Sequence, residues 1–357
     1  MHIESVSRMV VGHIGKQVLF VIALSSVIAI GVSEISCAQK VKSITGVGST
    51  FAGPLYQNWA EGAEKEIGVQ VNYQPLGSGA GRNQIISKTV SFGALDVPTS
   101  VEKLTKNNLV QFPTAIGGIA VVVNIPNIKH HMLRLTGPII ADIYSGKIKK
   151  WNDPKITEIN KDVVLEDLDI APIYRADGSG TTQVFTSYLV KESHNWAETY
   201  GSNTSIAWPL GIGGRGNGSV ASMVKNIKGS IGYVEFAYAL QNHLCMVQLK
   251  DSAGEYITLT EDSLRAAAKT ADWVHSKNFN VDLINIVGEN AWPIVSTTYV
   301  LVPAYNQNSK GVVKFFRWAF DKGDGIAYTL HYVPLPIFVK EKIEKTWEYA
   351  GITPNNS

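Results

Sequence analysis

Strand-like and helix-like segments alternate along most of this chain, and that alternation limits the folds it can adopt. Segments rich in β-branched residues that end at glycine or proline are typical of strands, and apolar residues four positions apart are typical of helices. The strand-like segments are 69–77, 117–126, 170–176, 229–237 and 297–303. The helix-like segments are 53–68, 82–90, 181–192, 218–227, 261–273, 310–323 and 340–351. This order predicts an α/β fold with helices on both faces of its sheets.

The first 38 residues have the layout of a secretory signal peptide. Arg8 and Lys16 precede an apolar run at 18–33, and small residues follow at Ser36 and Ala38. The apolar run is short for a membrane-spanning helix, which would be the alternative. We therefore predict export and cleavage after residue 38.

The rest of the composition excludes several classes of protein. A lipid-modified Cys37 would be another kind of N-terminus, but Glu34 fits a lipoprotein signal poorly, and no lipid anchor is expected. Without residues 1–38 only Cys245 remains, so no internal disulfide is predicted. The formal net charge is +2 with no long basic block, and no nucleic-acid partner is expected. The length suits about two domains of roughly 150 residues each.

Three turns combine glycine, serine or threonine, and the start of a helix. They are GVGSTFAGPLYQNWA at 46–60, YQPLGSGAGRNQIIS at 73–87 and YRADGSGTTQVFTSYL at 174–189. Glycine lets backbone N–H groups approach a ligand closely, and the N–H groups of a first helical turn have no acceptor within the helix. One such turn is most simply an ordinary helix cap. Three of them together predict an anion site at helix N-termini.

Three ionisable residues sharpen this prediction. Arg175 can contact an oxyanion through two N–H groups, and Asp177 can hold its guanidinium in place. Asp96 follows a strand-like run and most simply marks a turn. An ionised carboxylate accepts hydrogen bonds and cannot donate them. Among anion-binding donors, Asp96 would accept the proton that phosphate keeps near neutral pH and would repel sulfate, which keeps none.

The chain resembles the periplasmic phosphate-binding proteins of bacterial phosphate-specific ABC importers. The matching segments are GVGSTFAGPLYQNWA, NYQPLGSGAG, FGALDVP, QFPTAIGGIAVVVNIP, IYSGKIKKWND, RADGSGTTQVFTSYL, IGYVEFAYA and AWPIVSTTYVLV, in family order. The resemblance implies a two-lobed periplasmic binding protein, each lobe a mixed, mostly parallel sheet flanked by helices. Two crossings of the chain between the lobes would form the hinge. Lobe 1 would contain 39–118 and 298–357, and lobe 2 would contain 119–297.

The resemblance also implies a phosphate site and a role in transport. The phosphate-binding residues that it implies are Thr50, Phe51, Ser78, Asp96, Arg175, Ser179, Gly180 and Thr181. Asp96 would accept the phosphate proton, and Asp177 would orient Arg175. The protein would bind inorganic phosphate in the periplasm as a monomer and deliver it to the membrane permease of an ABC importer. No cofactor, no metal and no enzymatic activity are expected.

Three other functions are alternatives to this one. A secreted phosphatase or esterase could use Ser179 as its nucleophile, but that serine needs an aligned base, and no histidine motif suggests one. A dehydrogenase is suggested by GIGGRG at 211–216 followed by Glu235, at the spacing of a ribose-binding acid. Because no clear buried strand precedes this segment, we interpret it as a glycine-rich loop at the cleft edge. In a surface scaffold, phosphate would be incidental, and loss of the gene would leave phosphate import intact.

Overall fold

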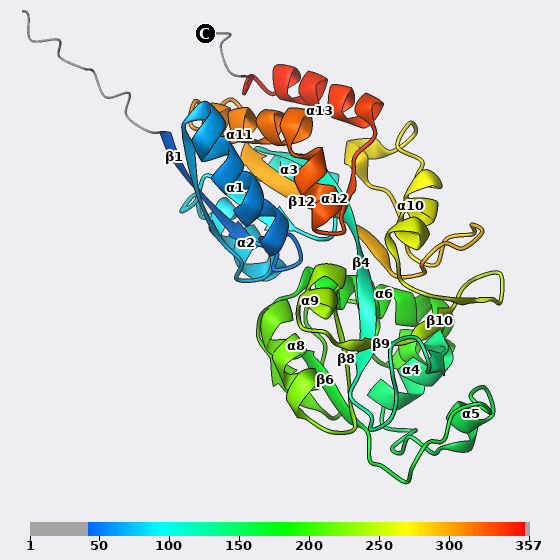
Figure 1. Ribbon diagram of the computed structural model, residues 1–357. Coiled ribbons are helices and arrows are strands. Elements are labelled where there is room, and N and C mark those ends of the chain that lie inside the picture. Colours follow the sequence, from blue (N-terminus) through cyan, green and yellow to red (C-terminus); the bar gives the residue numbers. More distant parts are fainter. Residues whose placement is uncertain (1–41, 354–357) are drawn as a thin grey trace, which may run out of the picture. The chain divides into compact units, whose positions relative to one another are not determined.

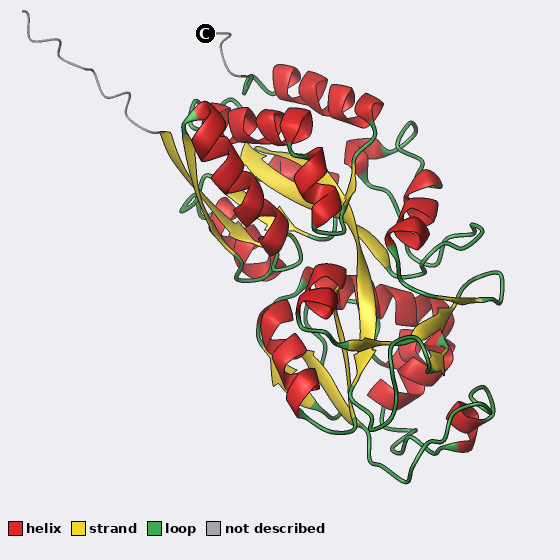
Figure 2. Cartoon of the chain, in the orientation of Figure 1, coloured by secondary structure: helices red, strands yellow, loops and turns green. Residues whose placement is uncertain are grey.

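The structure is a computed structural model that describes residues 42–353 (Figures 1 and 2). The predicted signal peptide and Cys37 lie outside the described residues. The strands are β1 Lys42–Gly48, β2 Val69–Gln74, β3 Phe92–Leu95, β4 Leu109–Val123, β5 Arg134–Leu135, β6 Ala171–Arg175, β7 Ile212–Gly214, β8 Ser230–Glu235, β9 Cys245–Met246, β10 Gln248–Lys250, β11 Tyr256–Ile257, β12 Val295–Pro303 and β13 Val333–Pro334.

Helices separate most of these strands. They are α1 Gly53–Ile67, α2 Ser78–Ile86, α3 Val101–Lys106, α4 Gly137–Tyr144, α5 Pro154–Thr157, α6 Gly180–Glu192, α7 His194–Thr199, α8 Gly216–Asn226, α9 Phe236–Gln241, α10 Glu261–Lys269, the 3-10 helix η1 Lys277–Phe279, α11 Ser309–Lys322, α12 Asp324–Thr329 and α13 Ile337–Tyr349. No helix among the described residues has both the length and the apolar character that a membrane crossing requires.

The long strand β4 organises the main sheet. The strand order is β2-β1-β3-β12-β4-β8-β6-β7, so β4 stands in the middle of the path (Figure 1). Residues Leu109 to Gly118 of β4 pair with β12, and residues Ile119 to Val123 pair with β8. A mixed sheet therefore extends on each side of the point where β4 changes partner. This arrangement, with helices beside the strands in Figure 2, confirms the predicted two-lobed α/β fold.

Strand direction also follows a pattern. The outer pairs β1–β2, β1–β3, β6–β7 and β6–β8 are parallel, as expected where helices connect successive strands. The pairs that β4 forms with β12 and β8 are antiparallel. A separate small sheet has the order β11-β10-β5. The parallel strands thus place their carboxyl ends, and the turns that follow them, on common sheet edges.

Strand β4 and helix α2 begin well before their predicted first residues. Strand β4 begins at Leu109, whereas the sequence predicted a start at 117. The strand can continue through Pro113 because this residue lies opposite the register shift between Thr298 and Tyr299 of β12, and a proline is tolerated at such an irregularity. Helix α2 begins at Ser78, earlier than 82, so the glycine-rich turn is itself helical. Gly77 turns the chain into this helix with a φ of 98°, a conformation that favours glycine.

An aromatic cluster around Phe316 holds the first helices against the sheet. Phe316 of α11 lies 5.4 Å from Tyr56 of α1, 5.5 Å from Phe92 of β3 and 5.4 Å from Phe112 of β4, measured between ring centroids. All four side chains are fully buried. The ring of Phe316 meets each of the other three rings edge to face, a favourable geometry for aromatic pairs. The cluster fixes the elements that carry the turns after β1 and β3.

Replacing Phe316 with alanine is expected to lower the free energy of unfolding by about 3–5 kcal/mol, because it leaves a cavity at the centre of this cluster. Urea denaturation followed by tryptophan fluorescence measures the change. Phe338→Ala is the matched control, since Phe338 on α13 is 47% exposed, and it should change stability by less than about 1 kcal/mol. Equal losses in the two variants would contradict this view of the core.

Candidate functional site

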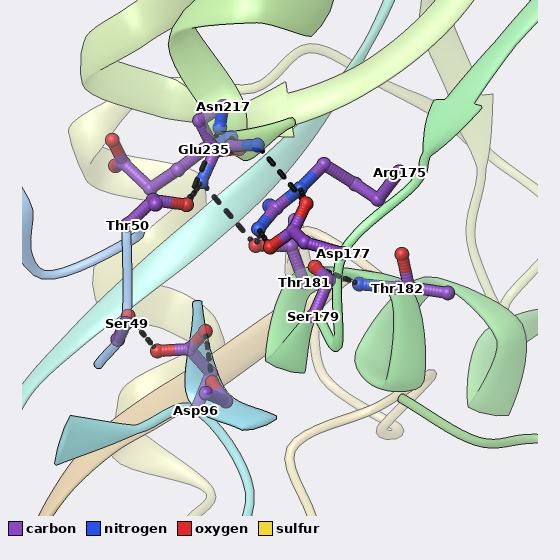
Figure 3. A network of polar contacts seen from close by, with 12 residues as sticks. Ser49, Thr50, Asp96, Arg175, Asp177, Ser179, Thr181, Thr182, Asn217 and Glu235 are labelled. Carbon is purple, nitrogen blue, oxygen red and sulfur yellow. Dashed lines mark hydrogen bonds and ion pairs between the residues drawn. The ribbon is translucent and has the colours of Figure 1, made fainter. Parts of the chain in front are cut away.

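A buried carboxylate lies at the end of β3. Asp96 follows Leu95 and is 1% exposed. The Ser49 hydroxyl donates to its Oδ1 (Figure 3), and the Ser78 hydroxyl donates to its Oδ2 at 3.2 Å. Ser49 reaches Asp96 because β1 and β3 are parallel and pair Gly48 with Ala94. The first two glycine-rich turns therefore meet at one acidic side chain.

The surroundings of Asp96 shift its titration. Burial raises the pKa of Asp96 to about 6, although the hydrogen bonds from Ser49 and Ser78 and the charge of Arg175 act in the opposite direction. The negative charge of Asp177 adds to the increase. Asp96 is consequently ionised at neutral pH, where it can only accept hydrogen bonds, and it becomes a donor below about pH 6.

Arg175 is held by an acid two residues further along the chain. Its Nε donates to Asp177 Oδ1 at 2.7 Å and its Nη2 donates to Asp177 Oδ2 at 2.5 Å, so the guanidinium is clamped by two parallel bonds. Nη1 donates to Thr181 Oγ1 at 3.3 Å. The Arg175 side chain is 1% exposed. Among the described residues these bonds use three of its five N–H groups, which leaves two for a ligand.

Burial raises the pKa of Asp177, but the hydrogen bonds and positive charge of Arg175, together with the Gly216 N–H, outweigh it and keep that pKa below its usual value. The pair is therefore ionised on both sides at neutral pH. Asp177 thus bonds to Arg175 through both of its carboxylate oxygens, the contact that the predicted orienting role requires.

The third turn begins helix α6 and touches the second turn directly. Ser179 caps the helix, its Oγ accepting from the Thr182 N–H at 3.0 Å. A Cβ at Gly180 would collide with Ser78 Oγ and with the Asp96 side chain, so the absence of a side chain there allows the two turns to approach. The Gly79 N–H donates to the Gly178 carbonyl at 2.8 Å across the same contact.

A fourth turn, at the start of α8, completes the network and was missed by the sequence interpretation. Asn217 is fully buried, and its Nδ2 donates to Thr50 Oγ1 at 2.8 Å and to Thr181 Oγ1 at 3.3 Å. The Gly216 N–H donates to Asp177 Oδ1 at 3.0 Å. We expected 211–216 to be a glycine-rich loop, but Ile212–Gly214 form strand β7 and Gly216 begins α8, where its N–H joins the network. Only the contact of Asn217 with Thr50, 167 residues away, could have revealed this role.

Four helix N-termini gather around these side chains. Helices α1, α2, α6 and α8 begin at Gly53, Ser78, Gly180 and Gly216, and they contain 15, 9, 13 and 11 residues. Each N-terminus carries a partial positive charge and N–H groups without intrahelical acceptors. Such an arrangement stabilises a negative charge without further cations.

The predicted site residues converge with one qualification. The contacts described above include Thr50, Asp96, Arg175, Asp177, Ser179 and Thr181, which Figure 3 labels, and also Ser78 and Gly180. Phe51 adjoins them through its backbone, while its ring packs in the core at 6.2 Å from Tyr332. The Tyr332 hydroxyl donates to the Phe51 carbonyl at 2.6 Å. Ser49, Asn217 and Glu235 were not predicted as members of this network.

The phosphatase and dehydrogenase alternatives gain no support from these contacts. Within residues 42–353, no histidine is hydrogen-bonded to Ser179, whose Oγ serves as a helix cap. No cluster of metal-ligating side chains occurs among the same residues. Glu235 is fully buried and caps α9, its Oε2 accepting from the Ala237 N–H at 3.0 Å, so it cannot serve as an exposed ribose-binding acid.

The sequence of this chain is similar to those of known phosphate-binding proteins. A family model described as the PBP superfamily domain matches residues 36–322. The chain is 46% identical to the phosphate-binding protein PstS of Haemophilus influenzae, covering 87% of this chain and 93% of that protein. It is 44% identical to the PstS of Pasteurella multocida, covering 90% and 94%.

Solved structures share the fold at lower identity. The phosphate-binding protein of Stenotrophomonas maltophilia superposes with a TM-score of 0.66 and 18% identity, covering 85% of this chain and 93% of that one. An ABC-type phosphate transport receptor from Vibrio cholerae superposes with a TM-score of 0.53 and 19% identity, and the match covers 82% of this chain and 100% of that one.

Glu235 generates a prediction about stability and pH. Burial raises its pKa from 4.5 to about 8, so the folded chain favours the protonated form. This stabilising contribution is fully present below pH 4.5 and is lost as the pH rises through 8. Glu235→Gln cannot ionise, so it should be about as stable as the parent chain at pH 4 and more stable by about 5 kcal/mol at pH 9. Urea denaturation across this range measures the difference, and parallel stability curves would contradict the prediction.

Proposed function

The chain belongs to the PBP superfamily, in the family of the phosphate-binding proteins PstS, and we propose that it binds inorganic phosphate and delivers it to an ABC importer. One observation carries the proposal for the ligand. Asp96, a buried hydrogen-bond acceptor, lies among serine and threonine hydroxyls, a buried arginine and four helix N-termini. Phosphate near neutral pH offers both the negative oxygens that such donors require and the one proton that such an acceptor requires.

Each member of the site has a part in this proposal. Thr50, Ser78, Ser179 and Thr181 would donate through their hydroxyls, and Phe51 and Gly180 through their backbone N–H groups. Arg175 would donate through the two N–H groups that Asp177 and Thr181 leave unused. Asp96 would accept the ligand proton. Ser78 donates to Asp96 in this structure, so its hydroxyl would turn toward the ligand on binding.

Oriented dipoles, and not net positive charge, would hold the anion. At neutral pH Asp96 and Asp177 are negative, and Arg175 is positive, so the cation is already balanced before a ligand enters. The remaining attraction comes from hydroxyl, amide and helix N-terminal donors fixed in place by the fold. Because these donors are buried, their interaction with a negative oxygen is stronger than it would be in water.

The change of partner along β4 supports the proposed lobes. We assign 39–118 and 298–357 to lobe 1 and 119–297 to lobe 2. Strand β4 passes from β12 to β8 between Gly118 and Ile119, and the Ile119 N–H donates to the Ile294 carbonyl at 2.8 Å just before β12 begins. The two crossings would therefore lie side by side and serve as the hinge. Opening there would separate Thr50, Ser78 and Asp96 from the Arg175–Thr181 turn.

The setting of the protein follows from the same proposal. The relatives are named phosphate-binding proteins, and one neighbour of known structure is described as a high affinity periplasmic phosphate-binding protein. We propose that this chain acts in the periplasm as a monomer, together with permease subunits in the membrane, and that it has no catalytic activity. The fully buried Ser179, committed to a helix cap, argues against a nucleophilic role.

Isothermal titration of residues 39–357, stripped of ligand, with phosphate and then with sulfate tests the function. Tight phosphate binding without a response to sulfate is expected. Incubation with a chromogenic phosphate ester tests the alternative. If the parent chain hydrolyses the ester and Ser179→Ala abolishes that activity, the protein is a hydrolase and the proposed binding function is wrong.

Arg175→Ala should weaken phosphate binding by about 2 kcal/mol or more, roughly thirtyfold in Kd, because it removes a buried charged donor and leaves Asp177 unpaired. Titration calorimetry measures the change. Arg265→Ala is the control, since Arg265 is 39% exposed and pairs with Glu261 on α10. An unchanged Kd in Arg175→Ala would exclude Arg175 from the site.

Asp96→Asn should weaken the discrimination against sulfate, because an amide can donate a hydrogen bond where the carboxylate cannot. Competition of sulfate against bound phosphate at pH 8 measures this. In the parent chain, sulfate should compete better as the pH falls below about 6, where Asp96 becomes protonated. If sulfate fails to compete in Asp96→Asn, the acceptor role of Asp96 is wrong.

A further inference from the structure

Asn217 stands at the junction of the two proposed lobes, between two threonines that the proposed function uses. We propose that Asn217 is a positioning residue that sets the direction of the Thr50 and Thr181 hydroxyl protons, so that both hydroxyls donate to a bound oxyanion. The inference rests on the proposed phosphate function. It adds a reason why the hydroxyls on one side of the ligand act as hydrogen-bond donors and not as acceptors. It starts from the orientation of the Asn217 amide.

A backbone group fixes that orientation. Asn217 Oδ1 accepts from the Glu235 N–H at 2.9 Å. Glu235 is the last residue of β8, paired with Ile119 of β4, so its N–H is held in place by the sheet. A backbone N–H can only donate, and reversing the amide would bring the Asn217 NH₂ group against it. Because Asn217 is fully buried, water cannot relieve such a conflict, and Nδ2 must face the two threonines.

The Thr50 hydroxyl is thereby turned into a donor. Its Oγ1 accepts from Asn217 Nδ2 at 2.8 Å and from the Asn217 N–H at 3.3 Å. A hydroxyl oxygen has two acceptor positions and one proton. Both acceptor positions are used by groups that cannot themselves accept, so the proton of Thr50 must point elsewhere.

The Thr181 hydroxyl meets the same condition from two residues. Its Oγ1 accepts from Asn217 Nδ2 at 3.3 Å and from Arg175 Nη1 at 3.3 Å. A guanidinium has no acceptor and stays protonated. One Asn217 amide group therefore supplies one N–H to each threonine, and the two hydroxyl protons are left for a ligand (Figure 3).

Opposite polarities then face the ligand from the two ends of the site. Around Asp96, the Ser49 hydroxyl donates to a carboxylate that can still accept one proton from the ligand. Around Asn217, the Thr50 and Thr181 hydroxyls can only donate outward. The geometry matches a tetrahedral oxyanion that carries its single proton on the Asp96 side and bare oxygens on the Asn217 side.

Two substitutions at Asn217 test the inference by calorimetric titration with inorganic phosphate. Asn217→Leu keeps the approximate shape and frees both hydroxyls to rotate, so the Kd should rise about tenfold. Asn217→Asp keeps the acceptor for the Glu235 N–H but offers the threonines an oxygen that draws their protons away. The Kd should rise about a hundredfold or more.

Asn160→Leu is the matched control. Asn160 is 1% exposed and also bonds through both ends of its amide, accepting from the Arg134 N–H and donating to the Arg134 carbonyl, away from the site. It should lower the melting temperature and leave the phosphate Kd within about twofold.

A double-mutant cycle separates positioning from general packing. In a Thr50→Val background, one of the two oriented hydroxyls is already absent, so Asn217→Leu should cost clearly less affinity than it does in the parent chain. A loss of the same size in both backgrounds would overturn the inference, and so would an unchanged Kd in Asn217→Leu. Failure of the parent chain to bind phosphate would instead refute the proposed function itself.

A measurement on the unaltered protein keeps the inference testable if a variant does not fold. When phosphate is bound, ¹H–³¹P NMR should detect scalar coupling between the phosphorus and the hydroxyl protons of Thr50 and Thr181. Coupling to backbone N–H groups together with the absence of both hydroxyl couplings would show that these hydroxyls do not donate, and would overturn the inference.

Discussion

A carboxylate removed from water has to be surrounded by hydrogen-bond donors, and Asp96 imposes that condition on the centre of this protein. Its oxygens are bonded by Ser49, which follows β1, and by Ser78, which begins α2. Ser296, in β12, donates to the Asp96 carbonyl at 2.5 Å. Three elements, β1, α2 and β12, are thus tied to one residue at the end of β3. The position of Asp96 depends on the parallel pairing of β1 with β3, so the sheet and the site cannot be changed independently.

The Arg175–Asp177 pair solves a related problem on the other side of the site. Burying a guanidinium costs free energy unless it is paired with an opposite charge. The two hydrogen bonds to Asp177 both compensate the charge of Arg175 and fix the plane of its guanidinium. Because the charge of Asp177 compensates that of Arg175, the pair as a whole attracts an anion only weakly through net charge. Recognition of an anion then falls to groups that are neutral overall but oriented, which suits a site that must distinguish ions by where their protons lie.

Close backbone approach is the third requirement, and glycine meets it. The contact of Gly79 with Gly178, and of Gly180 with Ser78 and Asp96, leaves no room for a side chain. These contacts join turns that are about a hundred residues apart in the chain. They also link the two parts into which β4 divides the sheet.

The sequence by itself determined the local features: the alternation of strands and helices, the three donor-rich turns, the strand end at Asp96 and the Arg175–Asp177 spacing. These depend on side-chain periodicity, on helix capping and on neighbours a few residues away, all of which are visible in a linear chain. Ser49 and Asn217 escaped notice because an ordinary serine and an asparagine after GIGGRG carry no local signal. Only the tertiary structure decided that Asn217 meets Thr50 across 167 residues, because the packing of β7 and α8 against the network chooses the partner of a buried amide.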